Sequence, residues 1–481
     1  MVNLDVDGAA KRIEQAAIDA WMRTEADLGP WIKQGSLYTA ASSARMLTVT
    51  SSGEFRLPPH QQGSEPLIEI GEPFDWTDYF QQSFAEIRAT VSEILNPWRS
   101  IPDPEELSSP LTAMISMAKN LQLESTQSKG ALLTANGELA TTIESIRANA
   151  DRMSGETMEA FQEKFLRKLE VAIGSLRSAA LARGNLADAH RVVWEKSRKK
   201  LHEILQWVEV GLREVAEGGE HSAQAKLGTL DFALKLAQLA PVGGVAAKIG
   251  MTAVSVAARN VPTENSAFWK PEDLRSCTGA LSQVSTALAG LDKHSRSAEI
   301  SINDYTVECI HAIEANRGLF DLRPSKIEAR GLNDPREFSY PPFEINQLVT
   351  KYMPGFASEI QQIAASTSGK GVSTALSRAS IGLPPCGGGA QIDQLGELIS
   401  ALLLDLASEM QNGAIELGAA LKEFLDLEDS IVEDTRKFLS ELDASHDDDP
   451  LWLQRKTSKD SGQVSKALSQ MMSENETPLA S

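Results

Sequence analysis

The sequence predicts an all-α protein, an elongated coiled-coil bundle of long-helix hairpins with a small Ala- and Gly-rich helical cap. In two segments, residues 281–312 and 395–442, apolar or small residues recur in steps of three and four along almost the whole length. Such steps place one narrow apolar stripe along a long helix, and that stripe must be buried against another helix. Aromatic residues make up only 6 % of the chain, a composition that favours paired helices over sheet.

The first region, residues 1–72, is expected to be irregular. An amphipathic helix is predicted over residues 6–24 within it. Residues 48–57, around Ser51-Ser52-Gly53, are the one candidate for a hairpin of strands. The Pro, Gln, Gly and Ser residues that follow are typical of a loop.

Residues 73–220 are predicted to form a long helical hairpin. Helices are expected over residues 74–95, 105–125, 130–152 and 156–217. Asp103 is predicted to be an N-cap and Pro104 a first-turn residue, which marks the start of the second of these helices. The last helix would be roughly 90 Å long if it were continuous, at about 1.5 Å per residue.

Residues 221–262 are rich in Ala, Gly and Leu and are predicted to be an apolar helical connector, or cap, with a turn at residues 241–244. The alternative is a segment that inserts into a membrane after a conformational change. Both interpretations depend on the same six residues: Leu239, Val242, Gly243, Gly244, Val245 and Ile249.

Residues 263–445 are predicted to form a second long helical hairpin. Its two arms are the helices expected over residues 271–313 and 392–442. Between them lies a loop-rich insert, residues 317–390, in which one modest helix is expected over residues 344–365. The remaining residues, 446–481, are predicted to be a disordered acidic and polar tail.

Charge and targeting signals narrow the class of protein. The chain has 46 Lys and Arg against 66 Asp and Glu, a net charge of −20, which argues against nucleic acid or an anionic membrane as the main partner. No cleavable signal peptide and no uninterrupted apolar run of bilayer length are visible. The chain is therefore expected to be soluble, and either secreted or at the cell surface without a cleaved signal, or otherwise cytoplasmic.

Residues that could carry chemistry do not form a recognisable catalytic or metal-binding pattern. His190, His202, His294 and His311 lie on predicted helices without a second ligand at a suitable offset. Lys370 lies in a Gly-rich stretch that lacks the spacing of a phosphate loop. Three cysteines are too few for a disulfide framework, and Cys277 and Cys309 are expected to be core thiols, with Cys386 in an exposed loop. No enzymatic activity, cofactor or metal is predicted.

Several short motifs lie between residues 97 and 201: Pro97-Trp98, Ile101-Pro102-Asp103-Pro104, a turn ending in Gly155, Ala160-Phe161, and a long helix with Trp194 to Arg198. Together they resemble the Trp-X-Gly (WXG) helical-hairpin superfamily, whose members are substrates of the type VII (ESX) secretion system. The resemblance implies an interhelix turn at Met153, Ser154 and Gly155, with Met where the superfamily has Trp. It also implies hairpin packing by Trp98, Phe161, Phe165 and Trp194.

The same superfamily carries a helical Tyr-X-X-X-Asp/Glu export signal, which places the aromatic and the acid on one helix face. Phe424 and Glu428 resemble this signal, with Phe in place of Tyr. The alternative is that Phe424 is an ordinary stripe residue and Glu428 a flanking charge.

Three functions follow as hypotheses. The first is a non-enzymatic, elongated helical protein exported by, or associated with, a type VII system, with the secretion machinery and a helical partner, or another copy of itself, as partners. The second is an α-helical pore-forming toxin component that inserts the apolar segment 227–258, the one case in which a membrane is a partner. The third is an intracellular coiled-coil scaffold.

Overall fold

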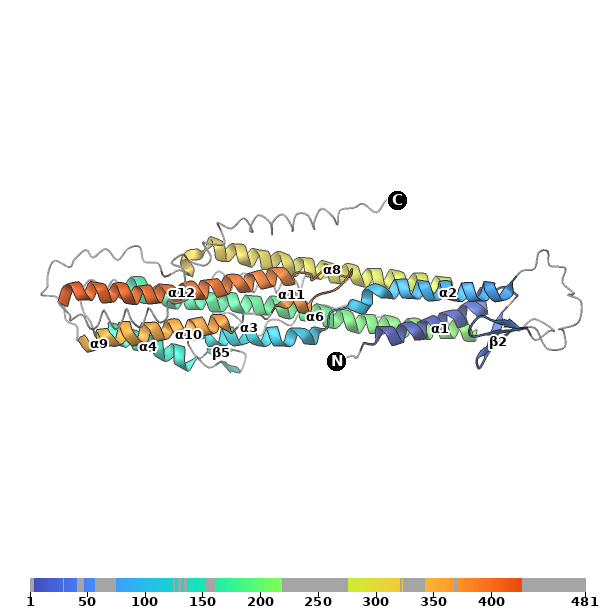
Figure 1. The fold of residues 1–481 in the computed structure, drawn as a ribbon, viewed down its shortest axis with the longest axis horizontal. Helices are drawn as coiled ribbons and strands as arrows, with labels where there is room; N and C mark the ends of the chain where they lie inside the picture. Colours follow the sequence, from blue (N-terminus) through green and yellow to red (C-terminus); the bar gives the residue numbers. More distant parts are fainter. Residues whose placement is uncertain are drawn as a thin grey trace, which may run out of the picture.

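A computed structural model of the chain shows an elongated rod of helices that lie side by side (Figure 1). It describes these residues: 4–28, 30–40, 47–56, 75–123, 126–128, 131–133, 136–152, 161–218, 276–320, 322, 342–366 and 371–425. The connector 221–262, the interhelix turn 153–155 and the tail 446–481 lie outside the described residues. None of the described helices is long and apolar enough to cross a bilayer.

One end of the rod holds a helix and a small sheet. Helix α1 (Val6–Thr24) has the predicted bounds and begins at Asp5, whose carboxylate accepts a hydrogen bond from the Gly8 N–H at 2.8 Å. An antiparallel sheet in the order β1-β2-β3-β4 follows. Its strands are β1 (Trp31–Gln34), β2 (Leu37–Ala40), β3 (Thr48–Thr50) and β4 (Phe55–Arg56). The region predicted to be irregular therefore contains a helix and a sheet.

The sheet corrects the predicted all-α class, because the molecule is mostly helical but not wholly so. The hairpin predicted over residues 48–57 is confirmed, with Val49 opposite Phe55 and a turn in which Gly53 has φ +87°. The other two strands were missed because each is four residues long, and so short an alternation of apolar and polar residues is a weak signal. Buried Trp31 and Tyr38 fix their inner face.

From the sheet the chain returns along the rod. Helix α2 (Trp76–Leu95) leads into the 3-10 turns η2 (Asn96–Ser100) and η3 (Pro104–Leu107), then α3 (Ser108–Asn120). The predicted cap is confirmed, since the Asp103 carboxylate accepts from the Glu105 N–H at 3.1 Å. A two-stranded ribbon, β5 (Thr126–Ser128) with β6 (Ala131–Leu133), and α4 (Gly137–Ala150) follow. The helices expected over 105–125 and 130–152 are thus shorter, because this ribbon occupies their adjoining ends.

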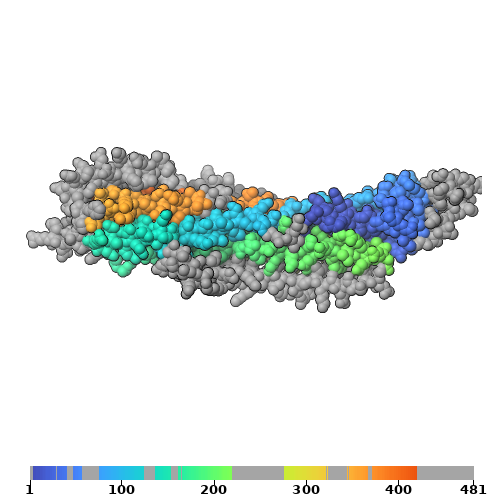
Figure 2. Space-filling view, turned by 90° about the horizontal axis from the view of Figure 1, so that it is seen from below, coloured from blue at the N-terminus to red at the C-terminus, as the bar shows by residue number. Residues whose placement is uncertain are grey.

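The longest helix is the spine of the rod. A π-helical turn, η4 (Gln162–Leu166), continues into α6 (Arg167–Glu217), 51 residues that end at Gly218 in the left-handed conformation. Segment 98–122 runs antiparallel to it: Gln122 bonds Arg177, Met114 lies against Gly184, and Arg198 reaches the carbonyl of Ile101. Figure 2 shows α4, α3 and α1 in succession along one face of the rod.

The second half of the chain adds α8 (Cys277–Ala315), η6 (Arg317–Leu319), α9 (Pro342–Gln347), η7 (Leu348–Tyr352), α10 (Met353–Ala365), α11 (Val372–Ala375) and α12 (Gly389–Leu425). Helix α8 runs antiparallel to α6, because Ser197 bonds Ser295 and Trp194 bonds Glu299. Helix α12 is also antiparallel to α6, since Arg183 bonds the carbonyl of Ile392 whereas Phe165 lies against Gly413.

It follows that α8 and α12 run parallel, so they are not the two arms of one hairpin, as the sequence led us to expect. Helix α12 pairs with α10, and α8 pairs with α6. The partners of α6 and α8 change halfway along the rod: they are α1 and α2 towards the sheet, and α3 and α12 away from it (Figure 1). The loop between α11 and α12 lies at this change of partners.

Candidate functional site

The four residues predicted to pack a hairpin are all buried but lie at separate places. Phe161 and Phe165 stack at one end, with ring centroids 5.1 Å apart. Trp194 lies 33 positions beyond Phe161, a separation of about 50 Å along the helix. Trp98 belongs to η2, in the middle of the rod. The two phenylalanines therefore lie at another level of the rod than the two tryptophans, and the four side chains do not form one cluster.

The remaining predicted site residues are largely beyond the described part of the chain. This holds for Met153, Ser154 and Gly155, for Glu428, and for the six connector residues Leu239, Val242, Gly243, Gly244, Val245 and Ile249. The backbone of Phe424 belongs to the last described turn of α12. The export signal and the membrane or cap segment stay predictions.

A buried ionic cluster that the sequence did not reveal lies in the middle of the rod. At its centre the Glu299 carboxylate, on α8, accepts hydrogen bonds from the indole Nε1 of Trp194 at 3.1 Å and from the backbone N–H of Leu383 at 2.7 Å. Both of its oxygens also accept from Nη2 of Arg378. The side chains of Glu299 and Arg378 are fully buried. We call Trp194, Asp292 and Glu299 the Glu299 socket.

Arg378 belongs to the loop between α11 and α12, residues 376–388, which we call the Arg378 loop. Besides Glu299, its guanidinium donates to three carbonyls of its own loop: Ile381 at 2.9 Å, Leu376 at 3.0 Å and Leu383 at 2.9 Å. The guanidinium carbon also lies 4.4 Å from the centroid of the Trp194 ring, a cation–π contact. Because burial disfavours the charged form, the pKa of Arg378 is lowered, and the charge of Glu299 opposes this shift.

Glycines allow the Arg378 loop to approach the socket this closely. Gly382 has φ +63°, and its N–H donates to the Asp292 carboxylate. A Cβ at this position would lie 2.5 Å from Oε2 of Glu299 and 3.0 Å from the Trp194 ring. Gly387 also has a positive φ, +55°, and faces Glu299 and Arg378. At both positions any other residue would be strained and would collide with the socket.

Further polar groups join the helices at the same level. His190 is fully buried with Nδ1 3.6 Å from Oε1 of Glu299, and neither ring nitrogen has a hydrogen-bond partner within the described ranges. The hydroxyls of Ser197 and Ser295 bond across α6 and α8 at 2.9 Å. Arg183 joins α6 to α12 by donating to the carbonyl of Ile392 at 3.1 Å. These buried groups fix the relative heights of α6, α8 and α12.

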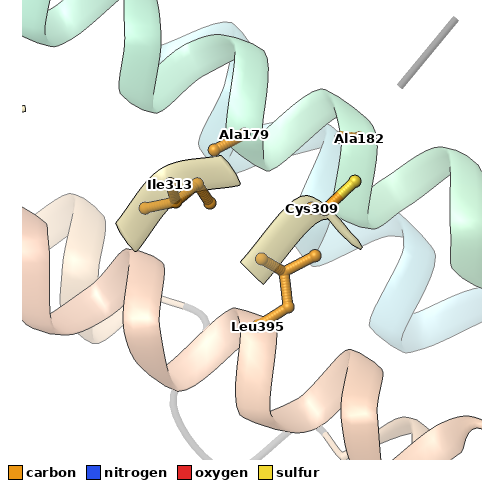
Figure 3. Close-up of a pocket in the computed structure, with 5 residues that line it drawn as sticks. All are labelled: Ala179, Ala182, Cys309, Ile313 and Leu395. Carbon is orange, nitrogen blue, oxygen red and sulfur yellow. The ribbon is translucent and has the colours of Figure 1, made fainter. Parts of the chain in front are cut away.

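A small apolar crevice lies between α6, α8 and α12, further along α8 than Glu299. It is lined by Ala179, Ala182, Cys309, Ile313 and Leu395 (Figure 3).

Cys309 and Cys277 are both buried, as predicted, and Cys386 of the Arg378 loop is half-buried. Burial, together with the nearby charges of Glu308 and Glu25 respectively, raises the pKa of each buried thiol to about 12. In the described part of the chain, no cluster of His, Cys, Asp and Glu could hold a metal ion.

The three cysteines are expected to differ in reactivity. At pH 8, Ellman's reagent should modify Cys386 first, because only a thiolate attacks the disulfide of the reagent, whereas Cys277 and Cys309 stay protonated and covered. In guanidinium chloride all three should react. Labelling of Cys309 as fast as that of Cys386 in the folded protein would contradict this arrangement, and a Cys386→Ser variant is the control that identifies the first thiol.

Comparison with known proteins adds no relative to these observations. No family model matches the chain, and no curated protein and no solved structure matches it significantly.

Proposed function

We propose that this chain is a non-enzymatic, elongated helical protein, exported by or associated with a type VII secretion system, that acts through contacts with a helical partner or with another copy of itself. The observation that carries the proposal is the antiparallel pairing of segment 98–122 with α6. A helical hairpin of this kind is what the resemblance to the WXG superfamily implies.

Two motifs of that resemblance, almost a hundred positions apart, meet in the rod. Arg198, the last residue of the Trp194 to Arg198 motif, donates to the carbonyls of Ile101 and Pro102 at 3.5 and 3.3 Å. Its guanidinium also lies 4.0 Å from the Asp103 carboxylate. Because both motifs take part in one contact, their joint presence has a structural reason, and this supports the hairpin interpretation.

The test is export from the native host. We expect the chain in the culture supernatant of the intact strain and its retention in cells that lack the type VII ATPase. Retention in both strains would contradict export and favour the intracellular scaffold. Secretion through an unrelated route, unaffected by loss of the ATPase, would also contradict the proposal.

The export signal has its own test. Phe424→Ala and Glu428→Ala should each reduce the secreted fraction at least tenfold, because the signal needs both side chains on one helix face. Glu416→Ala, which removes an exposed acid from the same helix, is the matched control and should be secreted normally. Normal secretion of the Phe424 and Glu428 variants would remove these residues from the export signal.

A second candidate function is a pore-forming toxin component, and one observation favours it. The two long helices on either side of segment 221–262 end together beside the sheet: Gly218 lies against Arg23, and the Thr278 N–H and hydroxyl donate to the Glu25 carboxylate at 3.0 and 2.6 Å. The described residues that precede and follow residues 219–275 therefore lie at the same end of the rod.

Liposome leakage separates this candidate from the first. A toxin component should release an encapsulated dye, and Gly243→Asp or Val245→Asp should abolish the release, because a charge in the bilayer centre is costly. Intact liposomes across pH 5–8 would count against a pore-forming role.

A further inference from the structure

We propose that the Glu299 socket is an arginine-recognition site which the chain fills with its own Arg378 loop, and that this loop is a latch whose release is the first step in separating α10 and α12 from α6 and α8. The proposal does not depend on export, because it concerns only contacts within the rod. Three properties of the site support the proposal: the chemistry of the socket, the internal hydrogen bonds of the loop, and the exposure of its outer surface.

The socket is matched to a guanidinium group. Glu299 offers a carboxylate to Nη2 of Arg378, while the Trp194 ring covers the plane of the guanidinium at 4.4 Å. Asp292 holds the loop backbone through the Gly382 N–H. A lysine ammonium has three donors and no planar face, so it cannot both stack on the ring and donate to the four residues that accept from Arg378. The recognised group is therefore an arginine side chain presented by a loop with glycine beside it.

Hydrogen bonds within the Arg378 loop hold much of its conformation. Three donors of the Arg378 guanidinium bind carbonyls within the loop, and the Arg378 backbone N–H donates to the Pro385 carbonyl at 2.8 Å. Beyond the socket, the loop is joined to η2 where the Ala379 N–H donates to the Ser100 hydroxyl at 3.2 Å. A segment organised in this way can leave and re-enter the socket as one piece.

The Arg378 loop covers the charged groups of the Glu299 socket, and it also buries the apolar side chains of Leu376 and Ile381. Ser377, Ala379, Ser380 and Pro385 are exposed, whereas Arg378 on the inner side is fully buried. When the loop lifts, water solvates Glu299, Asp292 and Arg378 and returns the desolvation cost of the buried ion pair. Opening an apolar helix seam brings no such compensation. Separation of α12 from α6 and α8 is therefore expected to start at the latch.

Amide hydrogen exchange on the full chain tests the latch. Arg378→Lys keeps the charge but loses the planar set of donors, and should raise exchange at residues 371–425 at least tenfold while leaving α1 and α2 unchanged. Gly382→Ala should do the same by a different route, because its Cβ would collide with Glu299 and Trp194. Ser380→Ala, at an exposed position of the same loop, is the control. Unchanged exchange in both variants, or an equal rise along the whole chain, would overturn the proposal.

Recognition in trans tests the socket. A synthetic peptide of residues 376–389 is added to full-length Arg378→Lys, or to Gly382→Ala if the first variant does not fold. The peptide should restore protection of residues 190–197 and 292–303, and the same peptide with Lys in place of its Arg should bind at least tenfold more weakly. Equal binding of the two peptides, or of neither, would show that the socket does not recognise arginine.

Discussion

Replacing Glu299 with Ala is expected to lower the free energy of unfolding by about 3–5 kcal/mol, because it leaves Arg378 buried without its counter-charge. Trp194 Nε1 and the Leu383 N–H lose their acceptor in the same step. Chemical denaturation followed by far-UV circular dichroism measures the change. Glu308→Ala removes an exposed acid two turns further along α8 and should change the free energy by no more than about 0.5 kcal/mol.

A double variant separates pairing from packing at this site. Glu299→Met together with Arg378→Met removes both buried charges, and replacement of a buried ion pair by apolar residues of similar volume is often neutral or stabilising. We expect the double variant to be more stable than Glu299→Ala. If the two are equally unstable, the unpaired charge of Arg378 is not the cause, and the cost comes from the hydrogen bonds to Glu299 that both variants lose.

Phe80→Ala is expected to destabilise the sheet end of the rod by about 3–5 kcal/mol, the usual cost of removing a buried aromatic ring. Phe80 is fully buried on α2. Its ring lies 5.5 Å from Trp31, 5.1 Å from Tyr79 and 6.3 Å from Phe55, centroid to centroid, so it joins α2 to both edge strands and the cavity left behind cannot close.

Hydrogen exchange, which measures local stability, distinguishes a loss of stability at the sheet end from a loss along the whole rod. Hydrogen exchange should rise at residues 31–56 and in the first turns of α2 while α10 and α12 stay protected, since these helices belong to the other half of the rod. Ile32→Ala, on the exposed face of β1, is the matched control and should leave stability within about 0.5 kcal/mol. A loss spread evenly over the rod, or none, would mean that Phe80 does not anchor the sheet.

The sequence predicted long helices well, because their signal is local. The bounds of α1 agree with the prediction, and α6 ends where Gly218 indicated. The prediction that α8 and α12 are the two arms of one hairpin was wrong, because an apolar stripe indicates which face of a helix is buried but not which helix covers that face. Helix α12 packs on α10, which lies between the two stripes in the sequence and which the stripes alone did not predict as its partner.

The ionic cluster escaped prediction for a related reason. On α8 the polar residues Glu299 and Thr306 are fully buried, whereas Ala298 and Tyr305 beside them are only partly buried. A single Glu beside a stripe resembles a solvated flank unless its partner is known, and Arg378 lies 79 positions away. The one signal was the run Gly387-Gly388-Gly389 after two prolines, which indicates a backbone that approaches another part of the molecule closely.

The change of helix partners along α6 and α8 has a consequence for transport. In the part of the chain that the structure describes, each level of the rod holds only a few helices, and those beside the sheet are α1, α2, α6 and α8. A two-by-two stack of helices, each about 10–12 Å across, has a width on the order of 20–25 Å. The described helices follow one another along the rod, so they add to its length and not to its width. An aperture that admits one bundle of four helices would therefore be wide enough for this stack of described helices.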